Sequence, residues 1–393
     1  MKKVFLLALV LVLGLVLSQC LPVWLGEAFL TAEKVAKTLM FVCLAFIMIN
    51  VGREFELDKT KWRSYAADYF IAMATAAVPW IMVAFYYMFL LPADLFGNWD
   101  AWKENLLLSR FAAPTSAGIL FTMLAAAGLR REWIYKKTQV LAIFDDLDTI
   151  LLMIPLQIFM IGFKWQLFAV VIVITFLLVI GWKKLGTIRL SQTWKSILFY
   201  AVCIVAVTES IYLLTKWMMG ADGAIHIEVL LPAFVLGMVM KTVHQHGNRD
   251  EKITGMISYL FMFLVGLSTP QFIGIDHGHR ITEAVGIIAA QPMPSWEVLI
   301  VHVIVVTLLS NLGKMFPLFF YRDRQLEERL ALSVGMFTRG EVGAGIIVIA
   351  MGYNLGGPAL IISVLSLVLN LLLTGGFVVI VKRLAQQAYG LKE

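Results

Sequence analysis

Three aspartates lie close together inside an otherwise apolar stretch of the sequence. Asp145, Asp146 and Asp148 occur in the run Ile-Phe-Asp-Asp-Leu-Asp. On a helix, Asp145 and Asp148 lie near one face, while Asp146 points about 100° away from Asp145. Burial and neighbouring like charges both favour the protonated form of such groups. A carboxyl group in this setting can bind a proton or, once ionised, a hard cation through its oxygens. The alternative is that one aspartate caps a helix break, or that the group lies at the aqueous interface.

Lys314 is a charged residue at a matching depth in a later apolar stretch, Ser-Asn-Leu-Gly-Lys-Met-Phe-Pro. It lies ~9 Å from the end of that stretch, and Asp145 lies ~12 Å from the end of its own. Charged side chains in the membrane interior usually pair or face a polar cavity, because each costs about 2.5–3.5 kcal/mol. The sequence therefore predicts an ion pair between Asp145 and Lys314. Extension of the lysine toward the lipid headgroups is the alternative interpretation.

Two of the apolar stretches are interrupted near their middles. One contains Phe-Ala-Ala-Pro-Thr-Ser-Ala-Gly, where Pro114 removes a backbone hydrogen bond and Thr115 and Ser116 offer hydroxyl groups. The other, Gly-Met-Phe-Thr-Arg-Gly-Glu-Val-Gly-Ala-Gly, surrounds Arg339 and Glu341 with glycines. Discontinuous helices in corresponding halves of a transporter mark a binding site near the membrane midplane. Arg339 and Glu341 are expected to compensate the charge of the half-helix ends. Close helix packing is the alternative explanation for the glycines.

The elements that must position these residues are membrane spans. The chain has 393 residues, of which 60% are hydrophobic and 15% are charged, whereas soluble domains are roughly 45–50% apolar and about 25% charged. A soluble fold is therefore excluded. Windows of about 20 apolar residues predict about twelve spans. They cover residues 4–25, 35–52, 66–92, 104–128, 137–163, 165–182, 195–214, 226–243, 253–275, 296–320, 329–352 and 359–381.

The distribution of basic residues predicts the orientation of these spans. Most of the 32 lysines and arginines fall in alternate loops, and such loops face the cytoplasm. This places both termini on the cytoplasmic side of an inner membrane, and it accounts for the net charge of +6 without a nucleic-acid partner. The first apolar run follows Lys2 and Lys3 and is longer than a typical signal-peptide core, so residues 1–25 are predicted to be an uncleaved first span.

Four motifs occur in the order found in one family of membrane transporters. Thr138-Gln-Val-Leu-Ala-Ile-Phe-Asp-Asp resembles a paired-aspartate span, and Val51-Gly-Arg-Glu-Phe-Glu-Leu resembles the ending of an early span. Phe337-Thr-Arg-Gly-Glu is similar to a broken-helix motif, and Lys314 stands where electrogenic members carry a lysine. From about residue 35 to 383 the chain thus resembles the second branch of the monovalent cation/proton antiporter superfamily, which includes the NhaA- and NapA-type sodium/proton antiporters.

The resemblance implies the NhaA-like fold, an all-α polytopic membrane protein of about twelve transmembrane helices with two crossed discontinuous helices. The third to fifth and the tenth to twelfth spans each form a triplet with an interrupted middle member and opposite topology, which predicts an inverted repeat. Residues 66–163 and 296–383 are expected to form the ion-transporting core. Residues 1–65 and 195–275 are expected to form a dimerisation or scaffold domain, and residues 164–194 the linking sixth span.

The resemblance also implies roles for the residues of the core. Asp146 is expected to be the primary ligand of Na⁺, with Asp145 beside it and paired with Lys314. Thr115 or Ser116 is expected to lend an oxygen. The interrupted fourth span departs from the family pattern because it has no acidic residue at the crossing, and Asp148 is an additional, accessory carboxylate without an assigned role.

These observations predict a secondary active antiporter that exchanges cytoplasmic Na⁺ or Li⁺ for external H⁺. The exchange is expected to be electrogenic and to proceed by an elevator-type movement in a homodimer surrounded by lipid, with no cofactor. A K⁺/H⁺ antiporter and a sodium-coupled organic-anion symporter remain open on the same fold. The symporter needs a cavity that coordinates an anion, and the adjacent aspartates argue against such a cavity. A cation channel is disfavoured because a channel does not need a titrating pair of aspartates beside a lysine.

The sequence does not predict an enzyme, because its cysteines and histidines have no metal-ligand spacing. The cysteines lie in apolar segments as small buried side chains, and four histidines lie in loops, where they could modulate a response to pH. The residues are Cys20, Cys43 and Cys203, and His244, His246, His277 and His279.

Overall fold

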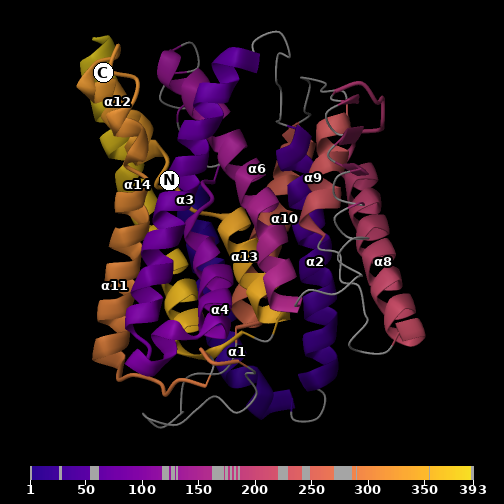
Figure 1. Cartoon of the computed structure of the whole chain (residues 1–393). Helices are drawn as coiled ribbons and strands as arrows, with labels where there is room; N and C mark the ends of the chain where they lie inside the picture. The colour runs from indigo at the N-terminus through magenta and orange to yellow at the C-terminus, as the bar shows by residue number, and fades with distance from the viewer. Residues whose placement is uncertain are drawn as a thin grey trace. The chain divides into compact units, whose positions relative to one another are not determined.

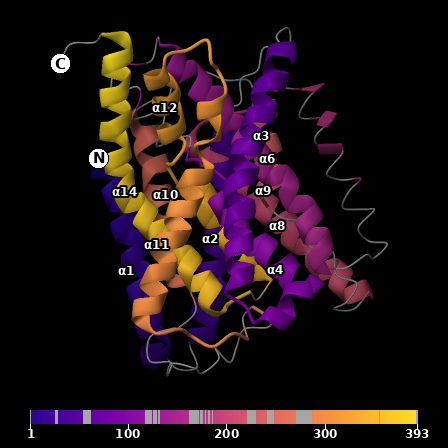
Figure 2. The same ribbon diagram turned by 60° about the vertical axis from the view of Figure 1, so that its left-hand side comes forward.

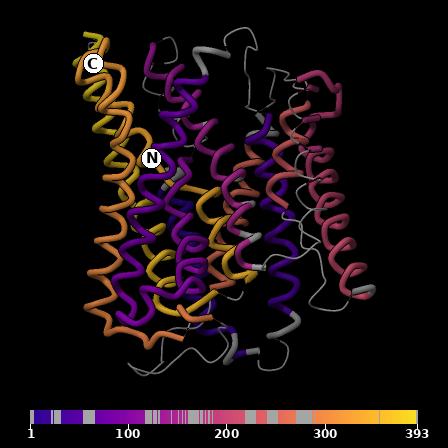
Figure 3. The backbone as a smooth tube through the Cα atoms, in the orientation of Figure 1, coloured from indigo at the N-terminus to yellow at the C-terminus, as the bar shows by residue number. Residues whose placement is uncertain are grey.

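The computed structural model describes most of the chain, and the described residues are the coloured parts of the tube in Figure 3. They are residues 2–25, 29–53, 62–116, 124, 129, 132–161, 172, 176–177, 179–180, 183–184, 186–219, 229–240, 248–269, 286–288, 290–353 and 355–390. Within these residues the regular structure is helical, apart from one isolated bridge between Ile188 and Met240. The predicted all-α fold class is confirmed.

The helices follow the apolar stretches of the sequence (Figure 1). The α-helices are α1 (Lys2–Leu25), α2 (Phe29–Arg53), α3 (Trp62–Phe89), α4 (Trp99–Ser109), α6 (Trp133–Ile161), α8 (Trp194–Met219), α9 (Leu230–Val239), α10 (Asn248–Leu267), α11 (Trp296–Gly313), α12 (Leu326–Gly335), α13 (Glu341–Gly352) and α14 (Gly357–Tyr389). Short 3-10 helices are η3 (Ala93–Gly97), η4 (Arg110–Ala112) and η6 (Phe316–Phe319). The predicted span 165–182 lies mostly outside the described residues.

Five of the described helical segments are long and apolar enough to cross a membrane. They are Ala32–Arg53, Ala66–Phe89, Trp194–Trp217, Trp296–Phe319 and Gly357–Tyr389. Shorter apolar helices, among them α9 and α13, accompany them. Many large apolar side chains on these helices are exposed, as expected for surfaces that face lipid rather than water.

The chain divides into two compact units. Unit 1 comprises Met1–Trp24, Thr60–Met160 and Val265–Glu393, and unit 2 comprises Leu25–Lys59 and Ile161–Leu264. The division of the chain into a transporting core and a dimerisation domain, made from the sequence, stays a prediction.

In unit 2, α2 packs against α8 and α9. The crossing of α2 and α9 is close because each helix presents a glycine there: a Cβ atom on Gly52 would overlap the carbonyl oxygen of Phe234, and one on Gly237 would overlap that of Ile49. Backbones can approach this closely only where side chains are absent.

In unit 1, α11 lies beside α3, and α14 runs along both α11 and α12 (Figures 1 and 2). Buried polar pairs fasten α14 to α11. The hydroxyls of Thr307 and Ser366 lie 2.8 Å apart, and the Asn370 amide donates to the Asn311 side-chain oxygen at 2.8 Å. These contacts hold the end of α11, where Lys314 stands, against its neighbours.

Candidate ion-binding site

The two stretches predicted to be interrupted are both interrupted in the structure. The helix α4 ends at Ser109 and is followed by η4, and residues 113–116 continue outside any helix. In the second stretch, α12 ends at Gly335 and α13 begins at Glu341. The rest of the first stretch lies largely outside the described residues.

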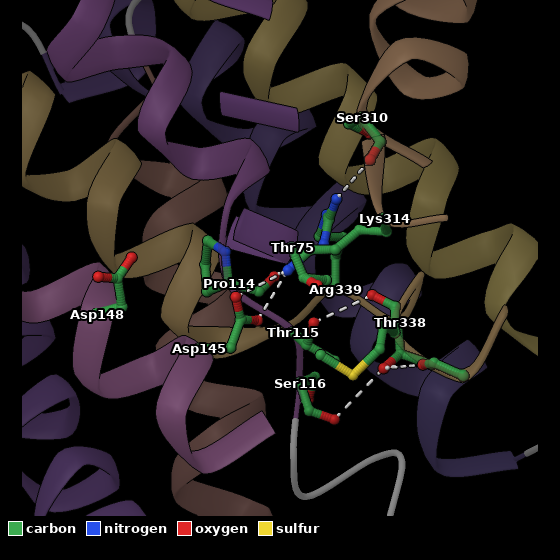
Figure 4. Close-up of polar contacts among 12 residues, drawn as sticks. Thr75, Pro114, Thr115, Ser116, Asp145, Asp148, Ser310, Lys314, Thr338 and Arg339 are labelled. Carbon is green, nitrogen blue, oxygen red and sulfur yellow. Dashed lines mark hydrogen bonds and ion pairs between the residues drawn. The ribbon is translucent and has the colours of Figure 1, made fainter. Parts of the chain in front are cut away.

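The two non-helical segments pair with each other through backbone and hydroxyl groups (Figure 4). The Ser116 amide donates to the Thr338 carbonyl at 2.8 Å, and the Thr338 hydroxyl is 3.5 Å from the Ser116 carbonyl. The Thr115 hydroxyl donates to the Met336 carbonyl at 3.1 Å. Oxygen atoms from main chain and side chain are therefore concentrated where the segments meet.

The carboxylates of α6 are buried beside these segments. Asp145, Asp146 and Asp148 are 0%, 1% and 2% exposed. The Lys314 ammonium, also 0% exposed, donates to both oxygens of Asp145 at 2.9 Å and 2.8 Å. The structure thus brings together the two residues whose depths in the sequence predicted a pair, and Lys314 points into the protein rather than toward the headgroups.

Lys314 owes its position to a close helix crossing. Gly313 lies against Pro79 of α3, so that a Cβ atom at Gly313 would stand 2.5 Å from the Pro79 Cα atom. The lysine is the C-terminal cap residue of α11. Positive charge at a helix C-terminus is favourable, and the ion pair adds two charge-assisted hydrogen bonds.

Two charged residues of the second interruption lie next to carbonyl groups and a helix end. Arg339, 2% exposed, donates to the carbonyls of Pro114 at 3.0 Å and Ser310 at 3.2 Å. Glu341 begins α13, where a negative charge faces the positive end of the helix dipole. The Ser116 hydroxyl donates to the Glu341 carboxylate at 3.4 Å. Arg339 thus serves as donor to one carbonyl of the first interruption and to one carbonyl of α11.

Sequence reasoning missed part of this arrangement. Thr338 and the Ser310 carbonyl hold the crossing together, although neither was assigned a role. Asp148 does not join Asp145 and Lys314: Figure 4 shows it on a different part of the helix surface, away from the lysine. Its partner is Arg110, at the end of α4. In the sequence, Arg110 stands out as a basic residue inside an apolar stretch. Nothing in the sequence predicts that its partner is Asp148.

A second polar cluster fixes the beginnings of α3 and α6. Asp68 accepts hydrogen bonds from Lys137 at 2.9 Å and 2.8 Å and from the Tyr321 hydroxyl at 2.8 Å. Tyr321 has a φ of 52°, in the left-handed region that side chains rarely adopt. Burial and the neighbouring Asp68 carboxylate raise the pKa of the Tyr321 phenol, so this residue remains a donor. The cluster orients α6 at the end that precedes its aspartates.

Among the described residues, no group of three or more histidines, cysteines, aspartates or glutamates is arranged to hold a metal ion. The histidines at 244, 246, 277 and 279 lie outside the described residues. Of the cysteines, which were predicted to be buried, Cys43 is buried and Cys20 is partly buried. The prediction is wrong for Cys203, which is exposed on the apolar helix α8.

The fold and this site define a class of protein: a multi-pass membrane protein whose buried charges lie where two interrupted helices cross. Comparison of the sequence with family models gives the family. Residues 2–383 match the model described as "Sodium/hydrogen exchanger, transmembrane", so the chain belongs to this family of membrane transporters. No curated protein matches the sequence.

Solved structures share the fold. The structure of the sodium proton antiporter MjNhaP1 from Methanocaldococcus jannaschii at pH 8 is similar with a TM-score of 0.61 and 12% identity, over 98% of this chain and 92% of that chain. An electron-microscopy structure of the same antiporter has a TM-score of 0.51 at 13% identity over the same shares. At these identities the likeness shows a common fold.

Proposed function

We propose that the protein is a secondary active antiporter that exchanges cytoplasmic Na⁺ or Li⁺ for external H⁺. One observation carries the proposal: two adjacent buried aspartates, one of them paired with a buried lysine, lie beside the crossing of two interrupted helices. Ionisable residues inside a membrane protein mark ion pathways and proton relays, and interrupted helices supply oxygen ligands at membrane depth. Membership of the sodium/hydrogen exchanger family supports the same conclusion.

The proposed chemistry is competition of a cation and a proton for the same carboxylate. Na⁺ and Li⁺ are hard cations that prefer oxygen ligands. Asp146 is the primary ligand in this proposal, with Asp145 close by, and Thr115 or Ser116 of the crossing segments contributes a further oxygen. A carboxylate that has taken up a proton no longer offers a negative charge to the cation, so binding of one excludes the other.

Lys314 gives the exchange its dependence on membrane potential. A buried lysine can release its proton, unlike arginine. When the cation binds and weakens the hold of Asp145 on Lys314, the Lys314 ammonium can release a second proton, which Asp145 no longer stabilises. Two protons then move for each cation, and each net charge is worth about 2.3 kcal/mol per 100 mV.

Alternating access is proposed to be an elevator-type movement of the core, residues 66–163 and 296–383, against a dimerisation domain in a homodimer. The contacts of Arg339 with Pro114 and Ser310 tie both interruptions to α11. This linkage favours movement of the site as one rigid piece. The positive-inside pattern supports insertion in the inner membrane with both termini in the cytoplasm.

The test is proton flux into liposomes that contain only this protein, followed with an internal pH dye while Na⁺, Li⁺, K⁺ or choline is added at several pH values. A cation-dependent pH change is expected with Na⁺ and Li⁺, and it should vanish in Asp146→Asn. The exposed Asp94, replaced in Asp94→Asn, is the matched control and should retain exchange.

Three results would overturn all or part of the proposal. Exchange that persists in Asp146→Asn would remove that residue as the ligand. A folded, inserted protein that responds to no cation would favour the organic-anion symporter, to be tested with a sodium gradient and a panel of organic anions. A response to K⁺ alone would replace Na⁺ by K⁺ in the scheme.

A further inference from the structure

The connection between α11 and α12 carries two arginines that the exchange proposed above does not use. Arg322 and Arg324 are both exposed. They lie on a tight turn, which is closed by a hydrogen bond from the Arg324 amide to the Tyr321 carbonyl at 2.9 Å. The distribution of basic residues in the sequence predicts that this connection faces the cytoplasm. Two positive charges therefore stand where a membrane span meets the polar layer of the membrane.

The two guanidinium groups are held in place but keep donors for another ligand. The Arg322 Nε atom donates to the Phe319 carbonyl at 3.4 Å, and within the described part of the chain its two terminal nitrogens meet no acceptor. The Arg324 guanidinium lies over the Trp133 ring, 5.1 Å from the ring centre, and its side chain is 40% exposed. Stacking on an aromatic ring leaves the N–H groups at the edge of the guanidinium plane accessible. Such groups bind phosphate oxygens in pairs.

Acidic residues near these arginines compete only weakly. Asp323 lies between them in the sequence, and its carboxylate is 3.5 Å from the Arg324 Nε atom, with 74% of its side chain exposed. An ion pair this exposed contributes little. Glu328 accepts a hydrogen bond from the Tyr389 hydroxyl at 2.6 Å, and Glu327 lies in the first turn of α12, where the helix dipole favours a negative charge. The arginines therefore remain available to an external anion.

Exposed apolar side chains lie next to the arginines. Phe319 and Leu326, on either side of the turn, are both more than half exposed. Leu308 and Leu312, which lie one turn apart on α11, are also more than half exposed. On a membrane-spanning helix such side chains contact lipid acyl chains. The same segment thus offers an apolar surface for acyl chains and, at its cytoplasmic end, two donors for an anionic headgroup.

We propose that the connection between α11 and α12 is a binding site for an anionic phospholipid of the cytoplasmic leaflet. Arg322 and Arg324 bind the lipid phosphate, and an acyl chain lies against Phe319 and Leu312. The cytoplasmic leaflet carries a negative surface potential, and its anionic lipids are attracted by basic residues at the membrane surface. A zwitterionic lipid carries a positive group beside its phosphate, so the two arginines favour it less. The apolar side chains favour a lipid over a soluble phosphate.

Binding of the lipid stabilises a connection on which both parts of the proposed ion site depend. The connection follows Lys314 at the end of α11 and leads into α12, which ends at the second interruption. Tyr321 of the same turn donates to Asp68 near the start of α3. A ligand that binds only the folded protein raises its Tm. The inference does not require antiport, so it stands or fails independently of the proposed function.

The test is thermal unfolding of the purified protein in a neutral detergent, titrated with phosphatidylglycerol. Phosphatidylcholine with the same acyl chains and soluble glycerol phosphate are titrated in parallel. Phosphatidylglycerol is expected to raise Tm in a saturable way, whereas the other two compounds should raise it much less at the same concentrations. The measured quantity is the phosphatidylglycerol concentration that gives half of the increase in Tm.

Four variants assign the effect to the two arginines. Arg322→Gln and Arg324→Gln should each raise the half-maximal concentration about fivefold. Asp323→Asn removes the competing carboxylate and should lower it about twofold to fivefold. Lys195→Gln, the matched control, removes an exposed lysine that lies over the Trp194 ring, 5.7 Å from the ring centre, and should leave it unchanged.

The proposal fails on any of three results. An equal increase in Tm with phosphatidylcholine would show that the charge of the headgroup is not recognised. An equal increase with glycerol phosphate would assign the arginines to a soluble anion instead of a lipid. A half-maximal concentration that is the same in the wild type, Arg322→Gln and Arg324→Gln would place the lipid elsewhere. Because the substituted side chains are exposed, the variants are expected to fold, and their Tm without lipid checks this.

Discussion

Removal of the Lys314 side-chain charge should destabilise the protein in a strongly pH-dependent way. The Asp145 carboxylate, which is 0% exposed in the structure, loses two hydrogen bonds in Lys314→Met. It must then stay charged without its partner or take up a proton. Loss of one member of a buried pair typically costs about 3–5 kcal/mol.

The free-energy cost of protonating the buried carboxylate determines how large the destabilisation is and in which direction it changes with pH. To protonate an aspartic acid side chain of ordinary pKa about 3.9 costs about 1.4 kcal/mol for each pH unit above that value, which is about 5.5 kcal/mol at pH 8 and about 1.5 kcal/mol at pH 5. The variant therefore regains stability as the pH falls. Staying charged, at about 3–5 kcal/mol, is the less costly state at pH 8, and protonation is the less costly state at pH 5. If the entropy of unfolding scales with chain length as in globular proteins, these costs correspond to decreases in Tm of about 4–6 °C at pH 8 and about 2 °C at pH 5.

The assay is thermal unfolding of purified wild-type and variant protein in detergent from pH 5 to pH 8. Lys382→Met removes an exposed lysine from α14 and should leave Tm unchanged at every pH. The double variant Lys314→Met/Asp145→Asn contains neither charge and should recover most of the loss. A decrease in Tm that is the same at pH 5 and pH 8, or a decrease below about 1 °C, would refute the assignment of a buried, charged pair.

Three further substitutions test other parts of the structure. Gly52→Ala should lower the free energy of unfolding by about 1–3 kcal/mol, because its methyl group would meet the α9 backbone. Gly255→Ala, which adds a methyl group in open space, is the control and should not lower it. Chemical denaturation measures both variants. Thr115→Val should raise the half-saturating Na⁺ concentration in flux assays about fivefold to tenfold, because the loss of one oxygen ligand weakens Na⁺ binding by about 1 kcal/mol. An unchanged half-saturating concentration would show that Thr115 is not a ligand. Tyr321→Phe should lose less stability than the wild type between pH 9 and pH 11. Burial and Asp68 raise the pKa of this phenol, so the unfolded chain ionises first and wild-type stability falls as the pH rises. Parallel melting curves for the two proteins would contradict this.

The sequence predicted the helices and the interruptions because both have local causes. Apolar length defines a span, and the Pro114 region and the glycines around Arg339 weaken a helix wherever they occur. The Asp145–Lys314 pair could also be anticipated, because distance from the span ends gives depth and only one lysine matched. These features follow from the order of residues along single spans.

The pairing of Asp148 with Arg110 could not be predicted in this way. It depends on how α4 is rotated about its axis relative to α6, and that rotation is set by packing of α4 against Trp80 of α3. The pairing of Thr338 with Ser116 likewise depends on how two segments more than 200 residues apart cross, which no single stretch encodes. The sequence identified the charged residues of the core, and tertiary packing decided which of them meet.

The central claim is that Na⁺ and protons compete for Asp146, and the most direct measurement is proton release on Na⁺ binding. Na⁺ is added to the purified protein in weakly buffered detergent solution near neutral pH while a dye reports the pH. The account predicts release of about one to two protons per bound Na⁺, with none in Asp146→Asn and an unchanged value in Asp94→Asn. Na⁺ binding without proton release in the wild type, or the same release in Asp146→Asn, would contradict it.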